Sequence, residues 1–382
     1  MAGLDERTRL SLWLHHGTAG SARRFREALL RLGAPEEAFR AAQRGARGAL
    51  APLPEPVAAR LAEAARPGFL DRYEAWLSEH GVGVCLLGDE DYPALLSEIS
   101  DAPPLLFYRG RMQADMRLPV AIVGARRCTP YGRDVARHFA RELTMAGCTV
   151  VSGMADGIDG CAAEGALSCE EAPYPTVAVL GSGIDVVYPA SHRALYEQIA
   201  ARGAVVTEFP PGTRPLRENF PVRNRIISGM SRGVLVVEAG ERSGTSITAG
   251  HALDQGREVF AVPGRITDLQ SVGPNRMIQR GEARPVFCAA DILAEFALLE
   301  EHDSFAHGPK RVPRASLAPG ERAVCAVLET GEQSFDELAE ALALPVDELN
   351  SLLTGLEFSG IIKPLPGRLY ALDTLNVALT DD

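Results

Sequence analysis

The sequence has few cysteines, and they form no pattern. Seven cysteines are scattered over 382 residues, and no two are spaced as CxxC. An odd, unpatterned set argues against a disulfide framework and a zinc ribbon, and is typical of a reducing compartment. The sequence also lacks an apolar run of the roughly 20 residues that a membrane span needs. Its first residues, MAGLDERTRLSLWLHHG, lack the basic-then-apolar pattern of a signal peptide. We therefore expect a cytoplasmic protein without membrane contact.

Signatures of the common nucleotide-dependent enzymes are missing as well. GxxxxGK[ST] does not occur, which disfavours a Walker-type nucleotidase, and Gly181–Gly183 lacks the third glycine of a GxGxxG fingerprint. Asp156 and Asp159 are close in sequence, but a helix cap for one and a loop hydrogen bond for the other explain them better than catalysis. His192 and His251 have no metal-ligand spacing. We predict no catalytic residue, no metal site and no cofactor.

Positive charge is scarce overall, because the formal net charge is −11. The acidic excess is concentrated at one end, since residues 320–382 hold 12 acidic and 3 basic residues, a balance of −9. Residues 101–299 hold 21 of each sign. Residues 209–225, FPPGTRPLRENFPVRNR, hold four arginines, two phenylalanines and one acid. The middle of the chain can therefore carry a dense basic segment without contradicting the total.

Short apolar, β-branched runs recur through the middle of the chain and alternate with segments of helical pattern. This alternation predicts a parallel sheet buried on both faces, and right-handed crossovers make it a doubly wound, Rossmann-like α/β fold. The expected strands lie in 118–123, 148–152, 176–180, 203–208, 233–238, 258–262 and 284–287. The expected helices lie in 132–147, 158–167, 191–202 and 245–256.

The pattern divides the chain into four parts. Residues 1–105 show helical spacing with glycine near the segment ends, which predicts a small N-terminal helical domain of the SAM or helix-hairpin kind. Residues 106–298 form the Rossmann-like domain. Residues 299–318 are polar with Pro and Gly, which predicts a linker. Residues 319–376 give three helices and a short hairpin, the order of a winged helix.

The predicted winged helix carries local helix signals and an unusual charge. Ser334 and Glu337 have the spacing of a capping box, and Pro345 restarts the third helix. The balance of −9 in this region repels phosphate, so DNA binding is disfavoured. A protein-contact or dimer-regulating role and a plain structural role both remain open.

Four glycine-containing turns follow expected strands, at 120–132, 150–160, 179–189 and 236–250. Ligands of open α/β sheets bind beyond the carboxyl ends of the strands. A single turn of this kind is explained equally well by a tight strand–helix connection. Four of them at one edge, with amides exposed at helix N-termini, favour a phosphate-binding surface.

Residues 209–225 follow the expected strand 203–208 and therefore belong to the same edge. Single-stranded nucleic acid is commonly held by cations that follow the backbone and by rings on which bases stack. Phe220 is our candidate ring, whereas Phe209 is expected in the core. The candidate cations are Arg126, Arg127, Arg214 and Arg217. Arg223 and Arg225 are expected to pair with buried acids such as Glu238 and to hold the fold.

Five ordered motifs resemble one bacterial protein family. They are SGMADGIDGCAAEGAL (152–167), TVAVLGSGIDVVYP (176–189), FPVRNRIISGMS (220–231), SGTSITAGHAL (243–253) and VFAVPG (259–264). In this order and spacing they resemble the DNA-processing proteins called DprA or Smf, strongly over residues 118–287. GPNRMIQRGEARPV (273–286) resembles the closing element of that family, and the flanking helical regions resemble its accessory domains more loosely.

The resemblance implies a cytoplasmic recombination mediator that is not an enzyme. Members bind and protect single-stranded DNA, load the RecA recombinase onto it during natural transformation, and typically form homodimers through the Rossmann-like domain. Carried over by position, the DNA-contacting pocket includes Gly124, Arg126, Ser152, Gly153, Arg217, Phe220, Ser243, Gly244 and Thr245. Arg223, Asn224 and Arg225 match the family's RNR element.

The second loop departs from the family pattern SGLARGIDAAAHRGAL. The family's arginine is Asp156 here, and its histidine and second arginine are Ala163 and Glu164. These changes remove positive charge from one side of the pocket. Either that side faces away from DNA, or binding depends more on the arginines of the other loops.

Two other functions are weighed against DNA binding. A nucleotide-processing enzyme such as a phosphoribohydrolase uses a GGxGT turn with a nearby Glu, which Glu238 and Ser243–Thr245 faintly resemble. The paired glycines and a well-placed acid are missing, so this hypothesis ranks lower. In a third hypothesis the chain is mainly a protein scaffold, and DNA binding is secondary.

Overall fold

The chain is described from a computed structural model, which covers residues 4–241, 243–296, 310–365, 367–373 and 377–380. It divides into two compact units, residues 1–291 and 292–382. Each unit is described by itself. Among the described residues, none of the helices has both the length and the apolar character needed to cross a membrane.

A nine-stranded sheet forms the centre of the first unit, in the order β1-β2-β6-β5-β4-β3-β7-β8-β9. The seven strands from β6 to β9 run parallel. They are β3 (Val120–Val123), β4 (Val150–Ser152), β5 (Thr176–Val179), β6 (Ala204–Thr207), β7 (Gly233–Val236), β8 (Glu258–Ala261) and β9 (Arg284–Pro285). All seven expected strands are therefore confirmed. Strand order reverses at β3, which lies between β4 and β7.

Helices connect these strands and cover the sheet. They are α7 (Pro130–Met145), α8 (Ile158–Leu167), α9 (Arg193–Arg202), α10 (Asn219–Gly229), α11 (Gly244–Asp254) and α12 (Val272–Gln279). Two apolar clusters account for the burial. One joins Val151, Val177 and Val236 with Ile226 of α10 and Ala249 of α11. The other contains Val205 and Ile199 of α9. The predicted doubly wound fold, buried on both faces, is thus confirmed.

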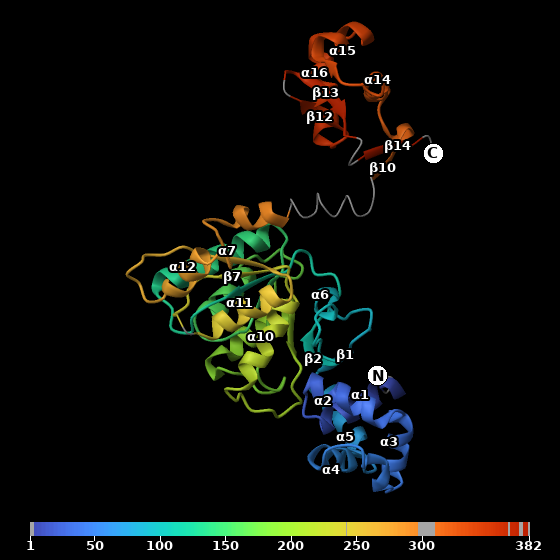
Figure 1. Cartoon of the computed structure of the whole chain (residues 1–382), viewed down its shortest axis with the longest axis vertical. Helices are drawn as coiled ribbons and strands as arrows, with labels where there is room; N and C mark the ends of the chain where they lie inside the picture. The colour runs from blue at the N-terminus through green and yellow to red at the C-terminus, as the bar shows by residue number, and fades with distance from the viewer. Residues whose placement is uncertain (1–3, 242, 297–309, 366, 374–376, 381–382) are drawn as a thin grey trace. The chain divides into compact units, whose positions relative to one another are not determined.

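The first 105 residues are mostly helical, as expected, but they are not only helical. The helices are α1 (Glu6–Gly17), α2 (Ala22–Leu32), α3 (Pro35–Gln43), α4 (Glu55–Ala64), α5 (Phe69–Glu79) and α6 (Ala94–Ser97). Residues 83–86 form strand β1 (Gly83–Leu86), which pairs antiparallel with β2 (Leu105–Gly110), and β2 pairs antiparallel with β6. Figure 1 shows α1–α5 gathered beside these two strands. The all-helical expectation is wrong for β1, because the apolar run GVCL is short and its partner is distant in sequence.

The N-terminal helices share a core with the sheet. Trp13 and Leu61 belong to the same apolar cluster as Phe107 of β2 and Val205 of β6. His15 is buried, and its Nε2 lies 2.8 Å from the carbonyl oxygen of Glu208, which follows β6. Burial lowers the pKa of His15 to about 4, so the ring stays neutral at pH 7. The helices are therefore fixed to the sheet edge where β6 ends.

The second unit has the predicted winged-helix order. Helices α14 (Pro319–Leu328), α15 (Phe335–Leu342) and α16 (Val346–Phe358) pack around Val324, Leu338 and Leu353. The hairpin strands β12 (Ile362–Leu365) and β13 (Leu369–Leu372) pair with each other, and β13 also pairs with the short β11 (Gln333–Ser334). Strand β10 (Lys310–Pro313) pairs with β14 (Val377–Thr380). The expected capping box is confirmed, because the Glu337 amide donates to Ser334 Oγ at 3.2 Å and the Ser334 amide donates to the Glu337 carboxylate at 2.7 Å.

Candidate functional site

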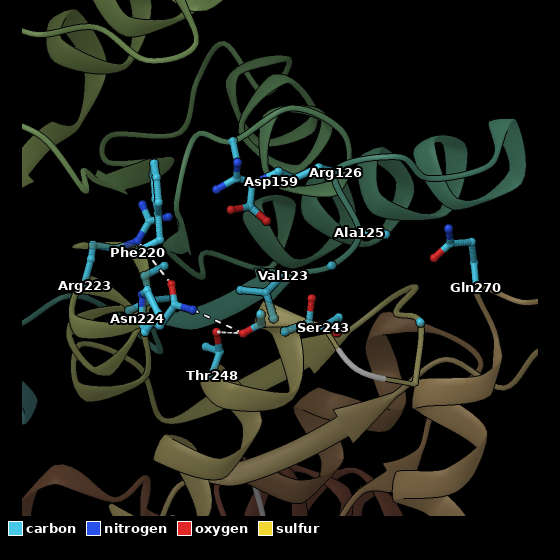
Figure 2. Close-up of a pocket in the computed structure, with 17 residues that line it drawn as sticks. Val123, Ala125, Arg126, Asp159, Phe220, Arg223, Asn224, Ser243, Thr248 and Gln270 are labelled. Atoms are coloured by element: carbon cyan, nitrogen blue, oxygen red, sulfur yellow. Dashed lines mark hydrogen bonds between the residues drawn. The ribbon is translucent and has the colours of Figure 1, made fainter. Parts of the chain in front are cut away.

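A cavity of about 280 Å³ opens where the strand order reverses, between the carboxyl ends of β3 and β7. Open α/β sheets bind their ligands at this switch point. The loops after β3, β4 and β7 and the helix α10 supply the walls (Figure 2). The lining residues are Val123, Gly124, Ala125, Arg126, Ala155, Asp159, Phe220, Pro221, Arg223, Asn224, Ile227, Gly240, Ser243, Gly244, Thr245, Thr248 and Gln270.

Glycines let the first two loops approach closely at this edge. A Cβ on Gly124 would lie 2.6 Å from Ile158 Cγ1 and 2.9 Å from the Glu238 carbonyl oxygen. Gly157 has a φ of +81°, and a Cβ there would lie 2.3 Å from the Ala125 carbonyl oxygen. No other residue fits at either position without moving backbone atoms. The sequence has glycine here because the loops that form the cavity wall are pressed together.

Phe220 presents its ring between two guanidinium groups. The Arg126 Cζ lies 4.6 Å from the ring centroid, and the Arg223 Cζ lies 5.8 Å from it. Both distances are within the range of a cation–π interaction. Arg126 is exposed and Phe220 is half-buried, so this pair is accessible from the cavity mouth. Tyr188 lies against the other part of the ring, with centroids 5.6 Å apart.

Arg223 lines the cavity and also stabilises its walls. Its side chain is buried, and Nη1 donates to the carbonyl oxygens of Gly153, at 2.8 Å, and of Val179. Burial lowers its pKa to about 10, while the nearby Asp159 carboxylate opposes this change. Arg223 therefore ties the ends of β4 and β5 to α10 and remains a cation at pH 7.

Asp159 is a buried carboxyl group at the base of the cavity. Burial raises its pKa to about 6, although Arg223 and the amides of Gly124 and Gly153 stabilise the carboxylate. The sequence predicts only a helix cap or a loop hydrogen bond for this aspartate. Its place in the lining had no sequence signal beyond its position in the GID stretch, and Thr248 and Gln270 had none.

The N-terminus of α11 forms the opposite wall. Asn224 Nδ2 donates to the Gly244 carbonyl oxygen at 3.2 Å and fixes this turn to α10. Ser243, at the N-cap position, has a buried Oγ without a hydrogen-bond partner among the described atoms. A buried hydroxyl that lacks a partner is costly unless a ligand or water satisfies it. The wall thus offers a hydroxyl and helix N-terminal amides to an anion.

The structure brings together eight of the thirteen predicted site residues in the cavity lining, namely Gly124, Arg126, Phe220, Arg223, Asn224, Ser243, Gly244 and Thr245. Gly153 contributes its carbonyl oxygen to Arg223 from behind. Ser152 is buried, and its hydroxyl donates to the Ile122 carbonyl oxygen at 2.8 Å. Arg127, Arg214 and Arg217 are exposed and lie outside the lining.

Arg225 pairs with a buried acid, as expected, but that acid is not the example named from the sequence. Arg225 pairs with Glu208 at 2.6 Å and with Asp101 at 2.9 Å, not with Glu238. Burial raises the pKa of Glu208 to about 7, and Arg225 opposes that change. Glu238 instead accepts hydrogen bonds from the Thr129 amide at 2.8 Å and from Thr129 Oγ1 at 2.5 Å.

Phe209 and the three positions that depart from the family pattern lie outside the cavity lining. Phe209 is buried, as expected of a core residue. Glu164 pairs with Arg137 of α7 at 2.9 Å, and neither Glu164 nor Ala163 lines the cavity. Asp156 lies 3.6 Å from His192 and is also outside the lining. The family positions that lost positive charge therefore do not contact this cavity.

Comparisons with known proteins agree on one family. Residues 83–297 match the family described as DNA recombination-mediator protein A, and residues 308–368 match the DprA winged helix domain. The chain is 37% identical to protein Smf of Escherichia coli over 301 residues, which is 76% of this chain and 78% of that protein. It is 40% identical to DNA processing protein DprA of Bacillus subtilis over 227 residues, 59% of this chain and 75% of that protein.

Two solved structures are also similar. DprA of Streptococcus pneumoniae aligns with a TM-score of 0.53 and 37% identity, over 70% of this chain and 96% of that one. DNA processing protein A of Helicobacter pylori, whose structure was described for its single-stranded DNA binding mode, aligns with a TM-score of 0.50 and 28% identity, over 58% of this chain and 96% of that one.

Proposed function

Because the chain belongs to the DNA recombination-mediator protein A family, also called DprA or Smf, we propose that it holds single-stranded DNA at the cavity between β3 and β7. The relative from Helicobacter pylori is described as binding single-stranded DNA, which supports the same ligand here. The cavity combines apolar side chains with charged and polar ones, and it lies at the sheet's ligand-binding edge.

The observation that carries this proposal is the ring of Phe220 beside the exposed Arg126. Bases stack on rings, and arginines contact the backbone that links the bases. The helix N-terminus at Ser243–Thr245, across the cavity, adds amide donors that suit a phosphate. A base on Phe220 and a phosphate near Ser243 would thus be neighbouring parts of one strand.

Removing the ring or the cation tests this site. We expect Phe220→Ala or Arg126→Ala to weaken binding of oligothymidine by about tenfold or more, because one stacked base contributes about 1–3 kcal/mol. Fluorescence anisotropy with the full chain measures the affinity. Phe287→Ala is a matched control, since this ring is 78% exposed and lies outside the cavity lining. Wild-type affinity in both site variants would rule out the cavity as the DNA site.

We also propose that the bound DNA is delivered to RecA. We infer that the chain protects incoming single strands and loads RecA onto them during natural transformation, without chemistry of its own. The family's description as a recombination mediator supports this. A pull-down of purified RecA with the oligonucleotide-bound chain tests it, and failure to retain RecA would contradict it.

Homodimerisation through the Rossmann-like domain is proposed as well. Helices α11 and α12 line a common cavity. Four exposed aliphatic side chains lie on α11 and on the loop that precedes α12, namely Ile247, Leu253, Ile266 and Leu269. Ile266 is 93% exposed and Leu269 is 82% exposed, as is typical of an interaction surface. Ile266→Asp with Leu269→Asp should yield a monomer by light scattering, and an unchanged mass would exclude these residues from the contact.

The alternative function, a phosphoribohydrolase-like enzyme, has less support. Its best candidate acid was Glu238, but that carboxylate is engaged by Thr129 and lies outside the cavity lining. A Cβ on Gly132 would lie 2.4 Å from Glu238 Cδ, so the acid is also packed against α7. Chromatography of nucleoside monophosphates after incubation with the chain would detect any released base.

A further inference from the structure

A second cavity, of about 340 Å³, lies on the N-terminal helices between α2 and the start of α4. Four arginines and a single acid line it, together with small and apolar residues: Arg23, Arg24, Glu27, Ala28, Arg31, Leu53, Pro54, Pro56, Val57 and Arg60. We call it the arginine groove. We propose that the arginine groove binds the phosphate backbone of nucleic acid and is a second contact for the strand held at the β3–β7 cavity. This inference rests on the proposed function.

The buried side of α2 is apolar, and its exposed side carries the cations together with the exposed Leu30. Phe25 and Ala28 are buried, whereas Arg24 and Arg31 are exposed. Arg24 and Arg31 are seven residues apart, about two turns, so they extend along roughly 10 Å of the helix. The groove therefore presents a line of positive charge and not a single point.

Two of the arginines are held at the groove by the backbone of its walls. Arg31 Nη1 donates to the Pro52 carbonyl oxygen at 3.2 Å, and Arg60 Nε donates to the Gly17 carbonyl oxygen at 2.8 Å. These bonds leave the other guanidinium nitrogens free for a ligand. Arg24 makes no side-chain hydrogen bond or ion pair with a described residue, so its charge is uncompensated. Arg23 is 3.7 Å from Glu27, and both are exposed, which makes this a weak pair.

The residues that line the arginine groove favour contact with the phosphates of a strand and not with its bases. No aromatic side chain is among the lining residues, so the groove offers no ring for stacking. The start of α4 contributes Pro54, Pro56 and Val57, but the prolines have no amide proton and the Val57 amide donates to the Pro54 carbonyl oxygen, so the arginines are the groups that would contact an anion. Residues 1–80 hold 12 arginines and 10 acids, a positive balance in a chain of net charge −11. This composition suits a sequence-independent contact with a polyanion.

One loop connects the N-terminal helices with the sheet edge that carries the β3–β7 cavity, and this loop holds two exposed arginines. α2 begins directly after Ser21, and a Cβ on the preceding Gly20 would lie 2.9 Å from Pro210 Cδ. Pro210 opens the loop that carries Arg214 and Arg217 and ends at Phe220. That loop therefore runs from a contact beside α2 to the ring that lines the β3–β7 cavity. In this proposal its two arginines, which lie outside the cavity lining, contact the strand between the two sites.

The test compares a short and a long strand on the full chain. The variant is Arg23→Ala with Arg24→Ala, because neither side chain holds backbone. We use labelled oligothymidine of about 6 nucleotides, which fills one site, and of about 40 nucleotides, which reaches both. The variant should bind the short strand like wild type and the long strand about tenfold more weakly. For the long strand, the slope of log affinity against log salt concentration should become shallower by about 1.4 in the variant. Each single-strand phosphate contact contributes about 0.7 to this slope, and two cations are removed.

The matched control is Arg44→Ala with Arg72→Ala, which removes the same charge from exposed positions outside the groove. An equal loss of long-strand affinity in the control would show that the effect comes from the total charge and not from the groove, and it would overturn the proposal. Unchanged long-strand affinity in the groove variant would also overturn it. If Phe220→Ala does not weaken the short strand, the proposed function fails, whatever the groove variant does.

Discussion

At the scale of single residues, the cavity combines cations with one buried acid. Arg126 and Arg223 lie within cation–π distance of Phe220, and Asp159 lines the same cavity with a pKa raised to about 6 by burial. A negative charge in a site that is proposed to take phosphate is unfavourable when it is ionised. The protonation of Asp159 therefore sets how positive the cavity is near neutral pH.

We expect DNA affinity to rise as pH falls from 7 to 5, because Asp159 becomes neutral through its pKa of about 6. Asp159→Asn should remove this dependence and bind about tenfold more tightly at pH 7.5, equivalent to about 1.4 kcal/mol of relieved repulsion. Anisotropy titrations across that pH range measure both. Asp156→Asn is the control, since Asp156 is exposed and outside the lining. A pH response that persists in Asp159→Asn would assign it to another group.

The same raised pKa affects stability in the opposite direction to an ordinary ion pair. The folded state binds a proton more tightly than the unfolded chain, so the contribution of Asp159 is fully present below about pH 4. It is lost as pH rises through about 6. Asp159→Asn should therefore flatten the fall in apparent melting temperature between pH 4 and pH 7.

Several of these residue roles could not be predicted from the sequence. Glu208 and Glu238 both follow expected strands at one sheet edge, so either could have paired with Arg225. The choice depends on which strand is nearest to α10, and that is a property of strand order, not of local sequence. Phe220, Arg126 and the glycine turns were predictable, because each follows a strand end and belongs to a residue type with a clear role there.

At the scale of elements, long apolar strands were predictable and the antiparallel edge was not. Every run from β3 to β9 was continuous enough to identify. The edge strand β1 and its neighbour β2 depend on a close backbone contact that no hydrophobic periodicity predicts. Gly110 ends β2 with a φ of +96°, and a Cβ there would lie 2.3 Å from the Gly203 carbonyl oxygen and 2.6 Å from that of Ala200.

Gly110→Ala should therefore destabilise the first unit by about 2–5 kcal/mol, from a left-handed backbone strain of about 1–2 kcal/mol and a further cost of overpacking. Gly81→Ala is the control, since Gly81 also has a positive φ, +61°, but nothing lies within 4 Å of its Cβ position. It should cost only the strain. Urea unfolding measures both losses of stability. Equal losses would show that steric crowding at Gly110 adds no cost beyond the backbone strain.

At the scale of the whole molecule, charge is divided between the two units. The last 63 residues carry a balance of −9, whereas residues 1–80 carry an excess of two arginines. The predicted boundaries at 105, 298 and 318 stay predictions, and residues 299–309 of the expected linker lie outside the described residues. The fold class did follow from the sequence, since it depends on patterns that repeat along the chain.

We expect a chain that lacks residues 300–382 to bind oligothymidine at least as tightly as the full chain, because the removed region is acidic and repels phosphate. Anisotropy at low and moderate salt measures this, with the largest difference at low salt. A clear loss of affinity would show that the winged helix contributes a DNA contact despite its charge.

The pairing of β1 with β2 limits how this protein can be cut into fragments. A fragment that begins at residue 106 would lose β1 and leave one side of β2 with unpaired amides and carbonyls. It would also uncover Phe107 and Val205, which the N-terminal helices bury. An exposed apolar strand edge is a template for aggregation. A truncated protein that fails to bind DNA would then report self-association, and the role of the N-terminal helices is better tested by point substitution in the intact chain.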